Sequence, residues 1–298
     1  MPGHRLPRQR GPRRPVRARP RRAARHPPAV SGQDAAAADF GRAKKSLGQH
    51  FLHERAYIER IVQALDPAPG DRLVEIGPGR GALTLPLLRR HGALTAIEFD
   101  RDLVAPLAAA AEGAGELAIL REDVLAVDFA ALAGDGPPLR LVGNLPYNIS
   151  SPILFHALDH AAAIRDMHFM LQKEVVERMA AGPGSKVYGR LSVMLQARCE
   201  VVPLFEVPPG AFRPPPKVDS AVVRLLPRAP ESTGIDDQAR FAAVVRAAFG
   251  QRRKTLRNAL SVVCDADTIA AAGIDPAARA EQLDVAAFVR LANVSPPR

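Results

Sequence analysis

Apolar, strand-like runs alternate with helical patterns through the middle of this chain. The run at 72–77 (RLVEIG) predicts a first strand, and the runs at 94–99, 117–121 and 139–145 predict three more. A helical pattern separates each of these runs from the next. Strands that alternate with helices form mostly parallel sheets with helices on both faces. The sequence therefore predicts an α/β fold with a doubly covered sheet.

The later part of the chain predicts an antiparallel edge and then a helical region. A fifth strand is expected at 167–171, and two more runs, 201–207 and 218–226, flank a proline-rich loop. We expect these last two strands to pair antiparallel at the sheet edge. Only helical patterns follow residue 236. The predicted organisation is thus a main domain at 40–230 and a small all-helical C-terminal domain at 235–298.

The N-terminal segment carries the whole net charge of +10. Ten of the 41 basic residues are arginines within residues 1–30, which leaves the rest of the chain balanced against its 31 acidic residues. Residues 1–39 are rich in Arg and Pro and poor in large apolar residues, so we expect a disordered tail that could attract RNA. It lacks the apolar core of a secretory signal, but a transit peptide or a start site assigned too far upstream remains open.

The sequence holds no apolar run of 18 residues, so we expect no membrane span. We expect a cytoplasmic location. Its two cysteines, Cys199 and Cys264, are far apart and show no metal-type spacing, so no metal site is expected either.

Polar or glycine residues stand where four successive predicted strands end. Gly77 follows the first strand, and Glu98, Asp123 and Asn144 stand at or just beyond the ends of the next three. Ligands of open α/β sheets bind beyond the carboxyl ends of the strands. An acid at the second strand suits the hydroxyls of a ribose, and an acid at the third can accept from an adenine amino group. The pattern predicts a nucleoside site.

The glycine loop at 75–81 (EIGPGRG) favours a nucleoside that carries no phosphates. No Gly-Lys-Ser/Thr follows it, as a P-loop would require. Pro78 lacks the N–H that a pyrophosphate-binding loop would use there. S-adenosylmethionine is a nucleoside of this kind.

The segment 144–148 (NLPYN) suits an exocyclic amino group on a nucleobase. Asn144 offers an acceptor and two donors. Pro146 biases Leu145 towards an extended backbone, which leaves the Leu145 carbonyl free to face a ligand. Tyr147 offers a flat ring for stacking on a base.

Taken with these motifs, the chain resembles the ribosomal RNA adenine dimethylase family, small-subunit branch, from about residue 44 to the C-terminus. The motifs that carry the resemblance are KSLGQHFL at 45–52, EIGPG at 75–79, NLPYN at 144–148, LQKEV at 171–175, FRPPPKVDS at 212–220 and RKTL at 253–256. It implies a Rossmann-like methyltransferase domain with a helical C-terminal domain. It also implies transfer of two methyl groups from S-adenosylmethionine to N6 of each of two adjacent adenosines, near the 3′ end of 16S rRNA.

The resemblance also implies a role for each site residue. Phe212 would cover the face of the target adenine opposite the ring of Tyr147. The family often has Asn where His50 stands, so His50 could act through its side chain or its backbone. By the same resemblance, His50 and Leu52 would line the cofactor. Gly77 would approach its methionine part, Glu98 its ribose and Asp123 its adenine. Asn144 would lie between the cofactor and the target base.

A basic cluster of Arg252, Arg253, Lys254 and Arg257 lies on an expected helix of the C-terminal domain. Residues four apart share a helix face, so Arg253 and Arg257 would contact RNA phosphates together. A solvated helix face is the alternative interpretation.

The expected partner is small-subunit rRNA or its 30S precursor particle, bound by a monomer with a role in small-subunit maturation. Three rival functions stay open. They are a large-subunit rRNA adenine methylase of macrolide-resistance type, a DNA adenine-N6 methylase, and a non-catalytic ribosome-assembly factor on the same fold.

Overall fold

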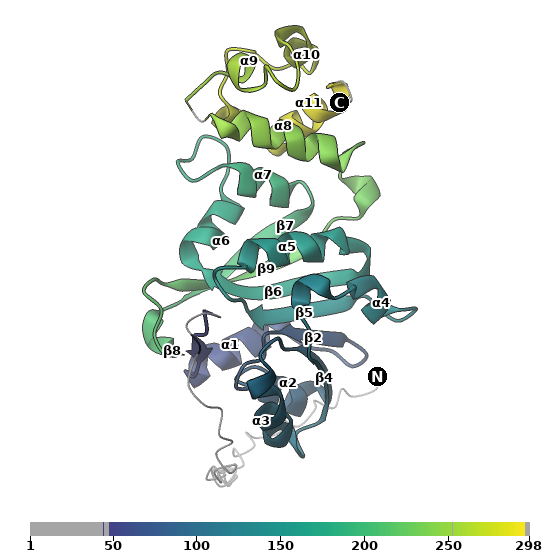
Figure 1. Cartoon of the computed structure of the whole chain (residues 1–298), viewed down its shortest axis with the longest axis vertical. Coiled ribbons are helices and arrows are strands. Elements are labelled where there is room, and N and C mark those ends of the chain that lie inside the picture. Colours follow the sequence, from purple (N-terminus) through teal and green to yellow (C-terminus); the bar gives the residue numbers. More distant parts are fainter. Residues whose placement is uncertain (1–43, 45–47, 252, 296–298) are drawn as a thin grey trace, which may run out of the picture. The chain divides into compact units, whose positions relative to one another are not determined.

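The structure is a computed structural model that describes residues 44, 48–251 and 253–295. Its main sheet has seven strands in the order β4-β3-β2-β5-β6-β9-β7 (Figure 1). The first five strands of this order, β4, β3, β2, β5 and β6, are parallel to one another. Strand β9 is antiparallel to both of its neighbours, β6 and β7. The predicted α/β sheet with an antiparallel edge is confirmed. The strands are β2 Arg72–Ile76, β3 Ala93–Ile97, β4 Glu116–Leu120, β5 Leu139–Asn144, β6 Ile164–Gln172, β7 Cys199–Val207 and β9 Ser220–Pro227. The predicted tail lies outside the described residues.

Helices cover both faces of this sheet because its central strands are apolar on both sides. Along β5, Leu141 packs into one apolar cluster and Val142 into another, as expected when successive side chains alternate across a strand. One cluster includes Ile153 of α5, and the other includes Leu87 of α2. The helices of this region are α1 Arg55–Leu65, α2 Thr84–His91, α3 Arg101–Ala111, α4 Phe129–Ala133, α5 Ser150–Asp159, α6 Lys173–Ala180 and α7 Arg190–Gln196.

A second, two-stranded sheet joins distant parts of the chain. It pairs β1 (Phe51–Leu52) antiparallel with β8 (Phe212–Arg213), with Leu52 opposite Phe212. This pairing brings the segment that precedes α1 beside the proline-rich loop between β7 and β9.

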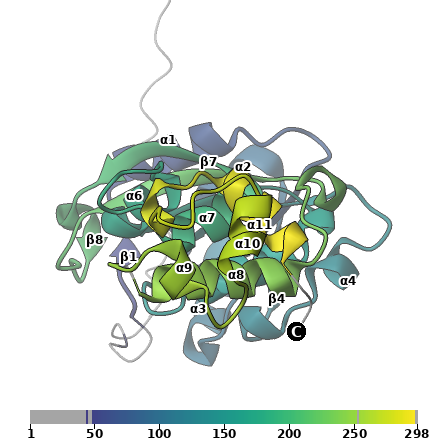
Figure 2. The same cartoon turned by 90° about the horizontal axis from the view of Figure 1, so that it is seen from above.

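The C-terminal helices pack on α7. The four are α8 Gln238–Gly250, α9 Leu256–Ala259, α10 Ala266–Ala271 and α11 Val285–Val294, and Figure 2 shows them gathered together. In α8, Phe241 belongs to the same apolar cluster as Phe288 of α11 and Val193 of α7. Asp237 begins α8 by accepting hydrogen bonds from the N–H groups of its first turn. The helical region is as expected, but whether it folds as a separate domain stays a prediction.

A buried arginine anchors the amino-terminal end of the sheet. The Arg140 side chain of β5 donates to Asp166 of β6 at 3.0 Å and to Asp71, just before β2, at 2.6 Å. It also donates to the Leu65 carbonyl at the end of α1, at 2.6 Å. Both carboxylates are themselves buried. Arg140 therefore ties α1, β2 and β6 together at the end of the sheet opposite Asn144.

No helix in the described ranges has both the length and the apolar character needed to cross a membrane.

Candidate active site

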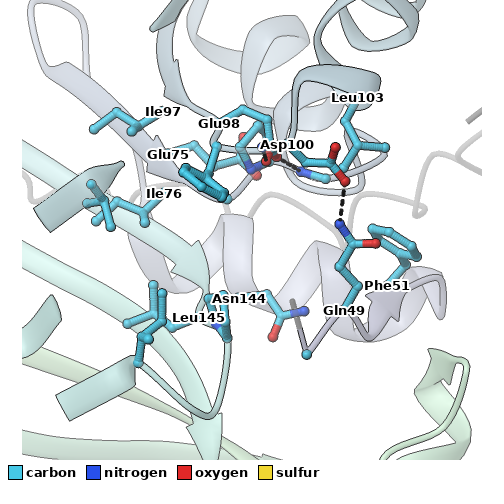
Figure 3. Close-up of a pocket in the computed structure, with 18 of the residues that line it drawn as sticks. Gln49, Phe51, Glu75, Ile76, Ile97, Glu98, Asp100, Leu103, Asn144 and Leu145 are labelled. Atoms are coloured by element: carbon cyan, nitrogen blue, oxygen red, sulfur yellow. Dashed lines mark hydrogen bonds between the residues drawn. The ribbon is translucent and has the colours of Figure 1, made fainter. Parts of the chain in front are cut away.

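The strand order places four polar strand ends side by side. From β2 the chain continues through β3 to β4 on one side and returns to β5 and β6 on the other. In open α/β sheets a ligand crevice forms where the strand order reverses in this way. A cavity of about 300 Å³ lies at this place, and Figure 3 shows residues that line it. The predicted residues that line it are His50, Leu52, Gly77, Glu98, Asp123, Asn144, Leu145 and Tyr147.

The glycine loop follows β2, and two of its glycines show why this residue is needed there. Gly77 and Gly79 have φ angles of +67° and +57°, in the left-handed region that side chains disfavour. A Cβ on Gly79 would also lie 3.0 Å from the ring of Phe51. The Gly79 N–H donates to Oε2 of Glu98 at 3.2 Å. The loop backbone is therefore held against the end of β3.

Two buried acids line the cavity at the ends of β2 and β3. Burial, opposed by the Thr84 hydrogen bond and assisted by the charge of Glu98, raises the pKa of Glu75 to about 8. Burial also raises the pKa of Glu98, although backbone N–H groups of Asp100 and Gly79 donate to its carboxylate. Burial therefore disfavours the charged form of both carboxyl groups, and a cation bound beside them would lower their pKa values again.

Asp123 lies beyond the end of β4 and is exposed. Its Oδ1 accepts from the Leu125 N–H at 3.0 Å, which begins a short 3₁₀ turn. Its carboxylate is the most solvent-accessible of the predicted nucleoside contacts.

Asn144 ends β5, at a place where the backbones of β5 and β2 approach each other closely. A Cβ on the preceding Gly143 would lie 2.4 Å from the Ile76 carbonyl oxygen of β2. The Nδ2 of Asn144 donates to the His50 carbonyl at 2.8 Å. The Leu145 N–H donates to the Met170 carbonyl at 3.1 Å. Within the described ranges, no loop hydrogen bond ends on the Leu145 carbonyl, so that oxygen and Asn144 Oδ1 can both accept from a ligand.

Tyr147 is half-buried and held at two points. Its hydroxyl lies 2.7 Å from Oγ of Ser220 in β9. Burial raises the pKa of this hydroxyl, against the opposing effect of the Ser220 hydrogen bond. Its ring stacks on the ring of His50, with centroids 5.6 Å apart and an angle of 24° between the planes.

Sequence reasoning missed the contacts that hold the segment before β1 across the cavity. Gln49 donates to Asp100, at the start of α3, at 2.9 Å (Figure 3). Lys44 reaches the other oxygen of Asp100 at 2.6 Å. Burial alone would raise the pKa of Asp100, but hydrogen bonds from Lys44 and Gln49 outweigh it and hold that pKa below its usual value. The exposed ring of Phe99, which also lines the cavity, was missed too.

The structure does not bring Phe212 to the cavity. Its side chain is 1% exposed and packs in an apolar cluster with Leu52 and Val207. The pairing of β8 with β1 causes this, because side chains alternate along a strand and the ring of Phe212 turns inward while Arg213 is exposed. The structure thus places Phe212 outside this cavity, and its role against the target base stays a prediction.

The basic cluster lies apart from the cavity, and the prediction that one helix carries it was wrong, although Arg257 lies in α9. Arg252 is outside the described residues. The helix α8 ends at Gly250 and α9 begins only at Leu256, so Arg253 and Lys254 lie in the intervening turn. The turn is closed by a hydrogen bond from the Lys254 N–H to the Gln251 carbonyl. Arg253, Lys254 and Arg257 are all exposed, but Arg253 and Arg257 do not share a helix face.

A family model described as ribosomal RNA adenine dimethylase matches residues 41–295. A relative from Xanthomonas campestris pv. campestris (strain B100), named ribosomal RNA small subunit methyltransferase A, is 76% identical over 252 residues, which are 85% of this chain and 96% of the relative. A relative of the same name from Xanthomonas oryzae pv. oryzae (strain PXO99A) is 74% identical over 254 residues, 85% of this chain and 97% of the relative.

Two solved structures are similar along most of the chain. A dimethyladenosine transferase from Plasmodium falciparum is 26% identical with a TM-score of 0.71, covering 81% of this chain and 96% of that one. The 23S rRNA methyltransferase ErmE is also 26% identical, with a TM-score of 0.64, covering 82% of this chain and 98% of that one.

Proposed function

Because the chain belongs to the ribosomal RNA adenine dimethylase family, we propose that it transfers methyl groups from S-adenosylmethionine to N6 of two adjacent adenosines in 16S rRNA. Each adenosine receives two methyl groups, near the 3′ end of the small-subunit RNA. The observation that carries this proposal is a single cavity that holds the strand-end residues Glu98 and Asp123 together with Asn144 and Tyr147.

The relatives favour the small-subunit target. Identity is 76% to a protein named for the small subunit and only 26% to the 23S rRNA methyltransferase. The complete set of strand-end residues argues against a purely structural assembly factor, which has no need of it.

The residues around the cavity fit S-adenosylmethionine. Glu98 would hold the ribose, Asp123 the adenine amino group, and the backbone at Gly77 the methionine part. Leu52 and the backbone of His50 would line the same ligand. The positive charge of the cofactor beside Glu75 and Glu98 would oppose the effect of burial on their pKa values. When bound, the cofactor supplies a methyl group activated by a positively charged sulfur.

Asn144 and Leu145 would act on the target amine. The bond from Asn144 Nδ2 to the His50 carbonyl fixes which end of the amide is free, and that end is the acceptor Oδ1. Oδ1 and the Leu145 carbonyl then accept the two N6 hydrogens of adenine. This directs the nitrogen lone pair at the methyl group and stabilises positive charge as it develops on N6.

No general base is needed before transfer, because the extra proton on N6 becomes acidic only after the new bond forms. The proposal is consistent with a segment, 144–148, that contains no His, Lys or carboxylate.

The target base would stack on Tyr147 after leaving its RNA stack, since enzymes that modify a base act on single-stranded or flipped nucleotides. The exposed Arg253, Lys254 and Arg257, with Arg252, would contact RNA phosphates. The partner would be the small-subunit rRNA within a 30S precursor particle, met in the cytoplasm by a monomer that takes part in small-subunit maturation.

The test is to incubate the full chain with methyl-labelled cofactor and under-methylated 30S subunits, with 50S subunits and adenine-containing DNA in parallel, and to map the label. We expect label only on two adjacent adenosines of 16S rRNA. Label on 23S rRNA or on DNA would support the corresponding rival enzyme instead. Cofactor and particle binding without any label would support the assembly factor.

A further inference from the structure

We propose that His50 is a positioning residue for the target base, and that its ring does not serve as a cofactor ligand. The inference rests on the proposed function, because it concerns how the same cavity holds adenine. His50 lies one residue before β1 and contacts two separate segments that the reaction needs in register: residues 144–147 and the loop after β8.

The first contact fixes the ring. Nδ1 of His50 lies 2.8 Å from the Pro214 carbonyl oxygen. A carbonyl oxygen only accepts hydrogen bonds, so Nδ1 must carry the hydrogen and donate it. Pro214 directly follows β8, and β8 is paired with β1. The ring is therefore held by the strand pair that borders the cavity.

The second contact supports the stacking platform. The His50 ring stacks on Tyr147 with centroids 5.6 Å apart, while the Tyr147 hydroxyl is held by Ser220. Because His50 stacks on one face of Tyr147, a target base that stacks on Tyr147 would take the opposite face. His50 thus supports Tyr147 from behind, because aromatic rings at this spacing attract each other and restrict rotation.

The third contact sets the catalytic amide. The backbone carbonyl of His50 accepts from Asn144 Nδ2 at 2.8 Å. One residue therefore fixes both the acceptor that would grip N6 and the ring on which the base would lie. A movement of the His50 side chain can therefore change the position of the Asn144 amide relative to the Tyr147 ring. A misplacement of about 1 Å can cost about 10²-fold in rate.

Three substitutions separate the two side-chain contacts. In His50→Asn the donor Nδ2 is attached to Cγ, as Nδ1 is in histidine, so the bond to Pro214 can be retained while the ring is lost. His50→Phe retains a ring for Tyr147 without the donor. His50→Ala loses both contacts. The matched control is His53→Ala, because His53 is exposed nearby and does not line the cavity.

The kinetic measurement compares kcat, the KM for 30S subunits, and the dissociation constant of the cofactor for each variant. We expect His50→Ala to lower kcat at least about tenfold, with cofactor affinity within about twofold of the wild type. His50→Asn and His50→Phe should each recover part of the loss. Cofactor affinity that falls in His50→Ala while kcat at saturating cofactor is unchanged would overturn the proposal, as would wild-type kinetics in all three variants.

A second readout is independent of activity. The chain has three tyrosines, so ring-labelled tyrosine gives a simple NMR spectrum in which Tyr147→Phe assigns the Tyr147 signal. We expect His50→Ala and His50→Asn to shift this signal and His50→Phe to keep it near its original ring-current environment. An unmoved signal in His50→Ala would overturn the positioning role even if methyl transfer is confirmed. Absence of methyl transfer by the wild type would instead contradict the proposed function.

Discussion

Thr84 donates its hydroxyl hydrogen to Glu75 Oε2 over 2.6 Å, and both side chains are buried. A buried carboxyl with a single neutral partner is poorly compensated as an anion. This explains why the pKa of Glu75 is raised to about 8.

The raised pKa predicts a pH-dependent loss of stability that Glu75→Gln should remove. Between the unfolded value of 4.5 and the folded value of about 8, the folded state holds a proton that the unfolded state releases. Stability from this group is therefore fully present below the unfolded pKa and is lost as pH rises through the folded pKa. At roughly 1.4 kcal/mol per unit, the loss between about pH 6 and about pH 9 is about 3 kcal/mol.

Urea unfolding of wild type and Glu75→Gln at these two pH values measures the difference. The glutamine keeps the shape of the side chain and an acceptor for Thr84, but it cannot ionise. The free energy of unfolding of Glu75→Gln should therefore fall less between these two pH values than that of the wild type, by about 3 kcal/mol. Parallel pH dependences in the two proteins would rule out a protonated Glu75.

Removing the Asn144 amide should slow the chemistry while sparing the fold. In Asn144→Ala, one acceptor for N6 and the bond to His50 are lost, and we expect methyl transfer to fall about 10²-fold, by analogy with loss of one oxyanion-hole donor. Single-turnover assays with saturating cofactor measure the step, and the thermal unfolding midpoint reports the fold. Turnover near that of the wild type would contradict the role of Asn144.

Arg140 should contribute far more to stability than its exposed neighbour Arg165, although both bind Asp71 at 2.6 and 2.8 Å respectively. Arg140→Met removes the buried cation that bridges Asp71 and Asp166, and removing one partner of a buried ion pair costs about 3–5 kcal/mol. Arg165→Met breaks a pair whose arginine is 56% exposed, which costs roughly 0–1 kcal/mol. The free energies of unfolding of the two variants, measured in urea, give the comparison. Equal losses would show that Arg140 does not anchor the sheet end.

Charge reversal at Arg253 and Arg257 should weaken RNA binding without changing cofactor binding. Each lost phosphate contact should reduce the slope of affinity against salt by about one. The matched control reverses Arg89 and Arg101, which are exposed near the opposite part of the fold. Filter binding of 30S subunits across a salt series, with calorimetry of the cofactor, measures both effects. An equal loss in the control pair would indicate a general charge effect instead of a defined contact.

Local patterns identified the cavity because its residues follow strands. Glu98 and Asn144 could be assigned from where apolar runs stop, and parallel strands bring such ends to one edge of a sheet. The direction of the Phe212 side chain could not be predicted, because it depends on the pairing of β8 with β1, two segments far apart in the chain. The bond from Gln49 to Asp100 was missed for the same reason, since no periodicity signals a contact between distant loops.

The prediction that one helix carries the basic cluster was wrong for a local reason. The pattern through residues 251–257 is polar and compatible with a helix, but Gly250 ends α8 and the chain turns before α9 begins. Glycine is the least favourable residue for continuing a helix apart from proline. Gly250 is therefore the residue in the sequence that indicates a turn at Arg253.

The strand β5 begins near Arg140 and ends at Asn144, so one short strand carries the anchoring arginine at one end and the proposed catalytic amide at the other. Stability and the proposed chemistry therefore depend on different side chains. Substitutions around Asn144 leave the anchoring charges untouched, so the residues at the cavity can change during evolution without removing the contacts that anchor the sheet.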